Sequence, residues 1–369
     1  MIPAEPGADE ALTPTRPSAR TNAILDVVGL SIAAGLIGWI FVAASASGGA
    51  PGAATALVLG CALAYILGRI LGSVGPTITP TLVVVSALVL ASVSIDETLS
   101  ATPLGGPFGY VNAKAAFFVQ AVFASLMLAV LTKAIGVRAL AVAAAIAFAL
   151  VPFVSHSWSA ALVVLSLPII AVVLSRSGAR IAIVGCVSVF ILVFLITAIL
   201  GGSYSASSDR SGPIAVLAHD TLTERRLELW NEALDLMISH PVTGVGPDRF
   251  QAVSEIAQSD SDARWAHNEF FQVGAEAGIV GLVLLLSLYL WPFARLWTEA
   301  GKPSLTALAA GSLAALGVHA CLDYVAHFPA IPLVAAALTG SATASAGARL
   351  NGPHRSPDPP PRNRAAASG

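Results

Sequence analysis

The chain of 369 residues is 56% hydrophobic and only 11% charged, with a formal net charge of −2. A soluble domain carries about 25% charged residues, so the composition excludes an ordinary soluble protein. The small net charge also argues against nucleic acid as a partner. Apolar runs of about 18 residues recur along the chain, and each is long enough to cross the hydrocarbon core as a helix. The composition therefore predicts an all-α, polytopic membrane protein.

The chain divides into membrane-spanning and polar segments. Residues 1–22 are polar and rich in proline, which predicts a disordered cytoplasmic N-terminus rather than a cleaved signal peptide. Seven transmembrane helices are expected in 23–201 and three in 273–346. The ten expected spans are 23–44, 53–72, 78–95, 114–132, 137–154, 159–175, 181–201, 273–294, 304–321 and 328–346. Residues 347–369 are basic and rich in proline, which predicts a disordered cytoplasmic tail.

The placement of Lys and Arg predicts the orientation. With the N-terminus in the cytoplasm, thirteen of these residues fall in inside segments and six outside. The positive-inside rule then puts both termini in the cytoplasm, as in a multi-pass protein of the cytoplasmic (inner) membrane. The one large loop, 202–272, is expected to be extracytoplasmic. A loop of this length is often functional.

The loop carries an amphipathic helix, "TLTERRLELWNEALDLMIS" (221–239). Thr221 and Glu224 have the spacing of a capping box, and the apolar residues follow one stripe. His240-Pro241 ends the helix, because proline disfavours helix at the residue before it. By itself, this pattern is equally typical of a helix lying on the membrane with solvated charges, and Trp230 is expected to seat it at the interface.

Two further stretches follow. "HPVTGVGPDRF" (240–250) predicts a tight turn, and it lacks the frame of a phosphate-binding loop. In "RWAHNEFFQ" (264–272), Asn268 can cap the next helix. His267 lies beside Arg264 and a helix N-terminus, where anions bind. A neutral imidazole there can accept a proton from a sugar hydroxyl, although a lone histidine is more often structural.

These stretches resemble the O-antigen ligase and O-antigen polymerase family of membrane glycosyltransferases. The family pattern is Arg-x-x-x-Trp, then His-Pro-x-x-Gly-x-Gly-Pro-x-x-Phe, then His-Asn with Glu-x-Gly. The matching residues are Arg226, Trp230, His240, Pro241, Gly244, Gly246, Pro247, Phe250, His267, Asn268, Glu276 and Gly278. "GPFGYVNAKAAFF" (106–118), with Asn112, and "HACLDYVAHFP" (319–329), with His319 and Asp323, are fainter echoes.

The chain departs from the family at one position. Trp158, in "SHSWSAA" (155–161), stands where the family often has an arginine between two middle spans. If that arginine binds donor phosphate, another group must replace it here. The candidates are His156, Lys114, Arg249 and Arg264.

The resemblance implies a GT-C-like fold and a role in polysaccharide biosynthesis for the cell envelope. Such enzymes move a glycan from a polyprenyl diphosphate, such as undecaprenyl diphosphate, to a hydroxyl of a glycan or glycolipid acceptor, without ATP or a nucleotide sugar. It implies Arg226 on the diphosphate, helped by Arg225 or Arg249, and His267 as the catalytic base or as a group that orients the acceptor. The expected substrate-binding residues are Arg225, Arg249, Arg264, Asn268, Asn112 and His319. No cofactor and no metal site are expected, since Cys61, Cys186 and Cys321 form no ligand pattern.

Several interpretations stay open at this stage. Ligase and polymerase share the motifs. A transporter or flippase of glycans or small anions would carry ionisable residues deep in its spans. Here Asp26, His319 and Asp323 lie near span ends. A non-catalytic assembly factor with the same fold is the third alternative, because of Trp158.

Overall fold

The computed structural model describes residues 19–101, 108–206, 224–259, 264–299 and 303–347. Every regular element in these ranges is a helix, so the predicted all-α class is confirmed. The helices are α1 (Ala19–Ser47), α2 (Gly52–Val74), α3 (Ile78–Val93), α4 (Ile95–Leu99), α5 (Val111–Leu131), α6 (Ile135–Val154), α7 (Trp158–Ser175), α8 (Ala179–Ala206), α10 (Glu224–Ser239), α11 (Phe250–Val253), α12 (Glu255–Ser259), α13 (Glu269–Trp297), α14 (Pro303–Leu322), the 3-10 turn η1 (Val325–His327) and α15 (Ala330–Gly347).

Each of the ten expected spans coincides with a helix. Eight of these helices are long and apolar enough to cross a membrane, whereas α3 and α15 fall short of that length. A polytopic membrane protein is therefore confirmed, but a count of ten spans is not. The N-terminal boundary was wrong by a few residues: α1 begins at Ala19, inside the segment 1–22 expected to be disordered, because its polar first turn continues the apolar helix. The rest of that segment and nearly all of the expected tail lie outside the described residues.

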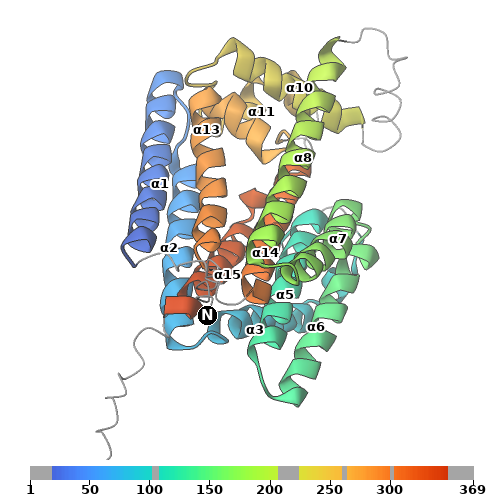
Figure 1. The fold of residues 1–369 in the computed structure, drawn as a ribbon. Coiled ribbons are helices and arrows are strands. Elements are labelled where there is room, and N and C mark those ends of the chain that lie inside the picture. The colour runs from blue at the N-terminus through green and yellow to red at the C-terminus, as the bar shows by residue number, and fades with distance from the viewer. Residues whose placement is uncertain (1–18, 102–107, 207–223, 260–263, 300–302, 348–369) are drawn as a thin grey trace, which may run out of the picture.

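Helices α5 and α14 form the centre of the bundle (Figure 1). Both are mostly enclosed by other helices, and α14 is almost completely so, whereas the remaining long helices leave more than half of their apolar windows uncovered. Small residues make this possible, since α14 is rich in Ala, Gly and Ser, which let helices approach closely. At Gly311 an added methyl group would come within 2.6 Å of the Phe123 ring on α5.

Helices α2 and α15 cross in direct backbone contact. An added Cβ at Gly68 would lie 2.1 Å from the Ala337 carbonyl oxygen, and one at Gly340 would lie 2.1 Å from the Tyr65 carbonyl oxygen. This is the close packing that small residues allow between helices in lipid. The crossing fixes α15, and therefore the chain that leads into it from the end of α14.

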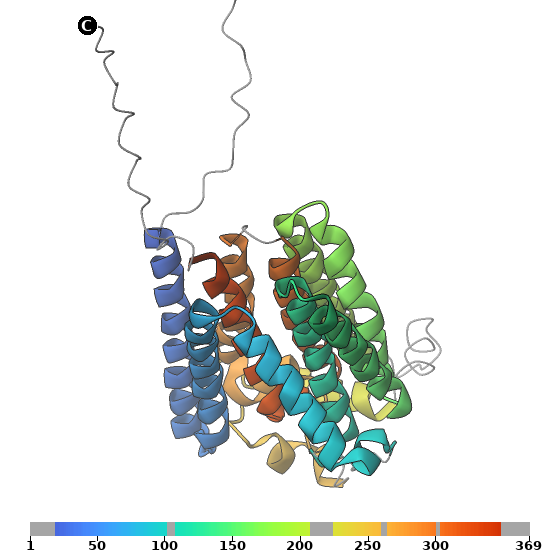
Figure 2. The same cartoon turned by 90° about the horizontal axis from the view of Figure 1, so that it is seen from below.

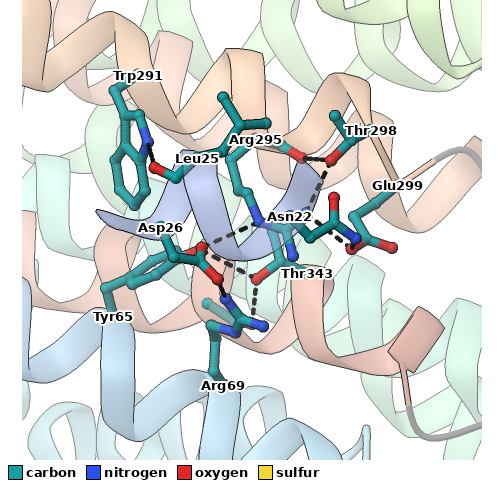
Figure 3. A network of polar contacts seen from close by, with 11 residues as sticks. Asn22, Leu25, Asp26, Tyr65, Arg69, Trp291, Arg295, Thr298, Glu299 and Thr343 are labelled. Carbon is teal, nitrogen blue, oxygen red and sulfur yellow. Dashed lines mark hydrogen bonds and ion pairs between the residues drawn. The ribbon is translucent and has the colours of Figure 1, made fainter. Parts of the chain in front are cut away.

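A network of charged residues ties α1, α2 and α13 together near the start of α1 (Figure 3). The Asp26 carboxylate pairs with Arg69 of α2, and Arg295 Nε of α13 lies 3.1 Å from Asp26 Oδ1. Arg295 Nη1 also lies 2.8 Å from Glu299 Oε1. Ionisable groups at membrane depth are costly unless they are paired. The pairing explains how these four charges are accommodated near the ends of apolar helices.

The described parts of the large loop lie at the other end of the bundle. Helices α10, α11 and α12 gather there, while the first turn of α1 and the last turn of α15 lie at the opposite end (Figures 1 and 2). The expected amphipathic helix is confirmed as α10, which ends before His240-Pro241. The proposed capping residue Thr221 lies outside the described residues. Trp230 is fully buried within the protein, so the expectation that it seats the helix at the membrane interface was wrong.

Candidate active site

The buried carboxylate of Asp323 is the centre of a polar cluster at the end of the bundle that carries α10. Asp323 follows the last turn of α14, and its side chain is 1% exposed. Its Oδ2 accepts hydrogen bonds from Tyr110 Oη and Asn112 Nδ2, each at 2.6 Å. Arg226 Nη2 of α10 lies 3.1 Å from the same oxygen. The start of α5, the loop helix α10 and the end of α14 therefore meet at one carboxylate.

The other oxygen of Asp323 faces the histidine. His267 Nδ1 lies 2.9 Å from Oδ1, close enough for an ion pair but without the orientation of a hydrogen bond, and the Tyr324 backbone N–H donates to the same oxygen at 2.8 Å. Burial alone raises the pKa of Asp323, but the nearby Arg226 charge and the contact with His267 outweigh it and hold the pKa below its ordinary value. Asp323 is therefore a carboxylate at neutral pH.

The backbone around His267 is fixed by its neighbours. His267 has φ 52°, a left-handed conformation that is uncommon for residues other than glycine. Trp230 Nε1 donates to the His267 carbonyl oxygen at 3.1 Å, and the Tyr324 ring meets the imidazole edge-on at 4.7 Å. The Arg-x-x-x-Trp motif thus has two separate tasks. Trp230 holds the backbone of His267, while Arg226, one turn earlier, reaches its carboxylate partner.

Asn268 caps α13, as predicted. Its Oδ1 accepts from the Phe270 and Phe271 backbone N–H groups at 3.1 and 3.2 Å, and its Nδ2 donates to the Cys321 carbonyl oxygen at 2.7 Å. The side chain is completely buried. Asn268 thus joins the start of α13 to the end of α14, and it sets the distance between His267 and Asp323.

The glycine-rich turn and the start of α13 interlock through their backbones. Helix α13 is broken at Gly278, which has φ 70°. The break frees the Ala275 and Glu276 carbonyl oxygens, which accept from the Val245 and Gly246 N–H groups at 2.8 and 2.9 Å. Pro241 O in turn accepts from Ile279 N at 2.8 Å. The second and third motifs therefore form one folded unit.

Close approach explains the glycines of this unit. A Cβ on Gly278 would lie 2.1 Å from the Val242 carbonyl oxygen, and one on Gly244 would lie 2.4 Å from the Glu276 carbonyl carbon. The Glu276 carboxylate completes the lock, since it accepts from the Asp248 and Phe250 backbone N–H groups at 3.0 and 3.1 Å. Larger side chains at either glycine would separate the two motifs.

The other residues expected to bind substrate lie in several places. Arg225 donates to Ser259 Oγ at 2.9 Å and pairs with Glu228 at 3.3 Å, so it points along the loop helices. Arg249 contacts the Ser47 backbone carbonyl at the end of α1. Arg264 is exposed, three residues before His267. Among the six expected substrate-binding residues, all of which the structure describes, Asn112 is the one whose side chain donates a hydrogen bond to the Asp323 carboxylate.

His319 lies one helical turn before Asp323, and it is buried within α14. Neither of its ring nitrogens has a hydrogen-bond partner among the described residues. It is therefore adjacent to the cluster in sequence, but no hydrogen bond within the described residues joins its ring to the Asp323 carboxylate. Of the two residues singled out in this segment, Asp323 is the one that forms the cluster, and substrate binding by His319 stays a prediction.

The segment that departs from the family also reaches the cluster. Ser157 Oγ donates to Asn112 Oδ1 at 2.7 Å. Trp158 is 71% exposed, and its ring stacks with His156 at 6.4 Å. Lys114 is fully buried, and its Nζ donates to the Glu97 and Ser100 carbonyl oxygens at 2.9 and 2.6 Å. Lys114 was one candidate to replace the arginine that the family often has between two middle spans. In the structure its ammonium group instead holds the end of α4.

The fold and this cluster define a polytopic membrane protein with a buried carboxylate between an arginine and a histidine at one end of its helix bundle. Residues 142–286 match the family model of the O-antigen ligase, which confirms the resemblance to the O-antigen ligase and polymerase family over this part of the chain. The match includes Arg226 and His267, and it stops before Asp323. The match supports a role in O-antigen ligase-like surface polysaccharide assembly. No curated protein matches the chain.

Proposed function

We propose that the protein transfers a glycan from a polyprenyl diphosphate to an acceptor hydroxyl at the outer face of the cytoplasmic membrane. The observation that carries this proposal is the single carboxylate, Asp323, held between Arg226 and His267. Glycan transfer needs a base for the acceptor hydroxyl and a cation for the departing diphosphate. The two groups stand side by side here.

The base is His267. When Nδ1–H donates to Asp323, the imidazole is held in the tautomer whose Nε2 carries the lone pair. Nε2 then takes the proton as the acceptor oxygen attacks the anomeric carbon. Asp323 stabilises the imidazolium that forms, in the manner of the aspartate in a hydrolase triad.

The cation is Arg226. The bond between the anomeric carbon and the diphosphate breaks as the new glycosidic bond forms, and the electron pair leaves with the diphosphate. A guanidinium has five N–H donors, and the contact with Asp323 uses Nη2. The other donors of Arg226 serve the leaving group. Arg264, three residues before His267, adds a second cation close to the site, whereas the charge of Arg225 is paired with Glu228.

The proposal includes the orientation in the membrane. Both termini lie in the cytoplasm and the 202–272 loop lies outside, where the lipid-linked donor is presented. Two observations support it. Lys and Arg are concentrated in the segments assigned to the cytoplasm. The first turn of α1 and the last turn of α15 also lie at the end of the bundle opposite α10, α11 and α12 (Figures 1 and 2).

Substitution of His267 tests the function. In an assay with purified protein, lipid-linked glycan and acceptor, His267→Ala abolishes transfer but leaves protein abundance and donor binding nearly unchanged. His267→Gln keeps a hydrogen-bonding group but cannot take the proton, so it does not restore turnover. Near-normal turnover of His267→Gln would contradict the role as base.

The surface glycans of cells with and without the gene distinguish the two forms of the reaction. Lost attachment with accumulation of long lipid-linked polymer identifies a ligase. Loss of long chains with accumulation of single lipid-linked units identifies a polymerase. Altered glycans together with an inactive purified protein would reject transfer and leave the non-catalytic assembly factor.

A further inference from the structure

Helix α1 contacts α13 at the break in that helix. The two helices lie side by side (Figure 1). Trp39 Nε1 of α1 donates to the Ala277 carbonyl oxygen at 2.8 Å. Ala277 is the last residue before the break at Gly278, and the last carbonyl groups of a helical segment have no partner within that segment. Trp39 therefore caps the first segment of α13, residues 269–277.

The bond from Trp39 completes a set of three. The glycine-rich turn donates to the Ala275 and Glu276 carbonyl oxygens, and Trp39 donates to the next carbonyl oxygen along the chain. Unpaired backbone groups are costly at membrane depth. The break in α13 is therefore stabilised jointly by the turn and by α1.

The end of α1 also holds the glycine-rich turn itself. Ala50 N, directly after α1, donates to the Pro247 carbonyl oxygen at 2.9 Å. The Arg249 guanidinium donates to the Ser47 carbonyl oxygen. The approach is close, since a Cβ on Gly49 would lie 2.5 Å from the Pro247 carbonyl oxygen. The turn thus lies between the end of α1 and the first segment of α13.

A line of buried side-chain contacts runs from this turn back to the histidine. Glu276, which binds the turn, accepts from Gln272 Nε2 at 3.2 Å. The buried Gln272 uses its Oε1 to accept from the Ala266 backbone N–H at 2.9 Å. Ala266 directly precedes His267. A displacement of the turn or of the break therefore reaches His267 in two ways, through the helical segment and through Gln272.

We propose that α1 positions the base, and that Trp39 is the residue through which it does so. This inference rests on the proposed transfer reaction. Trp39 lies outside residues 142–286, the part of the chain that matches the family. It acts through the first segment of α13, which keeps His267 Nε2 where it takes the proton. Arg249 acts in the same way from the turn, as a positioning residue and not as a ligand of the diphosphate.

A second indole bond between the same two helices supplies a matched control. Trp291 Nε1 of α13 donates to the Leu25 carbonyl oxygen of α1 at 2.6 Å, at the opposite end of the bundle (Figure 3). Trp39→Phe and Trp291→Phe each remove one indole N–H and keep an aromatic ring. Both should lower the melting temperature by a similar amount. Trp39→Phe alone should displace His267.

Steady-state kinetics of the purified protein in nanodiscs separate the two variants. A displacement of about 1 Å can cost about 10²-fold in rate, so the smaller shift after Trp39→Phe should lower kcat per folded protein roughly 10-fold. The KM values for donor and acceptor should stay unchanged, because Trp39 binds neither. Trp291→Phe should change neither kcat nor KM. Equal kcat values of the two variants would overturn the proposal, since a merely structural bond predicts that result.

Backbone amide exchange provides a readout that needs no substrate. Local loosening speeds the exchange of the affected amides. In mass spectrometry of full-length protein, Trp39→Phe should speed exchange in the peptide 264–272, which contains His267, and Trp291→Phe should not. Unchanged exchange in Trp39→Phe would show that α1 does not hold this segment.

Arg249→Met tests the second link, and it decides the proposal if Trp39→Phe does not accumulate as folded protein. Methionine keeps an unbranched apolar stem but cannot donate to the Ser47 carbonyl oxygen. We expect a lower kcat, an unchanged donor KM and faster exchange in the peptide 264–272. A higher donor KM with unchanged exchange would assign Arg249 to the diphosphate and overturn its positioning role.

The positioning role and the transfer reaction fail in different ways. If the natural protein transfers glycan but Trp39→Phe behaves like Trp291→Phe, the role of α1 is wrong and the transfer reaction stands. If the natural protein shows no transfer but Trp39→Phe alone speeds exchange around His267, α1 holds this segment and the transfer reaction is wrong.

Discussion

Replacement of Asp323 by asparagine gives the sharpest test of the site. Asparagine has nearly the same shape, but it has one acceptor oxygen and one donor group in place of two acceptor oxygens. In the structure, Oδ2 accepts from three donors and Oδ1 faces two more, His267 Nδ1 and the Tyr324 N–H. In either orientation, the amide NH₂ group must face donors.

The expected effects have two parts. Removal of one partner from a buried ion pair costs about 3–5 kcal/mol, so Asp323→Asn should unfold at a lower temperature. His267 also loses the carboxylate that orients it, so turnover should fall by roughly 10²–10⁴-fold, the usual contribution of a positioned base. Thermal unfolding and transfer are measured on the same purified protein, so that turnover can be normalised to folded protein.

Tyr110→Phe is the matched control. It removes one hydrogen bond to the same oxygen, worth about 1.5–3 kcal/mol, but leaves the carboxylate and its contacts with Arg226 and His267. It should lower stability and keep most of the turnover per folded molecule. If Asp323→Asn and Tyr110→Phe lose turnover equally, or if Asp323→Asn keeps near-normal turnover, Asp323 does not orient the base.

Arg226→Lys should lower turnover by roughly 10²–10³-fold, because lysine keeps the charge but lacks the planar guanidinium fork. Arg210→Ala, at a residue outside the described ranges, should have a mild effect, and equal effects of the two changes in the transfer assay would contradict a role of Arg226 in diphosphate binding. Gly278→Ala should lower the free energy of unfolding by about 1–3 kcal/mol through backbone strain, and its new Cβ would also clash with the Val242 carbonyl oxygen. Gly136→Ala, whose Cβ would meet no atom within 4 Å, should leave stability unchanged, and similar melting temperatures of the two variants would refute the interlocked turn. Burial lowers the pKa of His327, but the Glu269 carboxylate beside it has the larger effect and raises the pKa to about 9. The ion pair should therefore stabilise the fold fully below the unfolded histidine pKa of about 6.5, and this contribution should be lost as the pH rises through about 9. His327→Gln should remove this pH dependence of the melting temperature, and an unchanged melting profile would show that the pair is not charged.

The hydropathy of the sequence was enough to place the helices. Apolar runs predict spans because an unpaired backbone is not tolerated in lipid, and each expected run is a helix. Local rules also placed the end of α10 and the cap at Asn268, since both depend on residues close in sequence. The expected span 273–294, however, was one unbroken helix. The break at Gly278 depends on backbone contacts with Val242 and Pro241, which no local pattern reveals.

Some residues of the cluster were singled out from the sequence, and the others could not be, because their place in the cluster depends on tertiary contacts. Arg226 and His267 stood out because their motifs lie in the polar loop. Asp323 and Tyr110 lie at the ends of apolar helices, where a polar residue reads as an interfacial one. The signal was present in the His-x-x-x-Asp segment, but sequence alone gave no reason to prefer the aspartate over His319. Only the packing of α14 between α5 and α8 brings Asp323 under the loop.

The arrangement of charge follows from the reaction that we propose. The proposed transfer needs a cation at the departing diphosphate and a base at the acceptor hydroxyl. Arg226 on α10 and His267, directly before the first turn of α13, supply these two groups, and both lie against Asp323. Asp323 compensates the positive charge that the imidazole gains when it takes the proton. One buried carboxylate therefore couples the position of the base to the position of the cation.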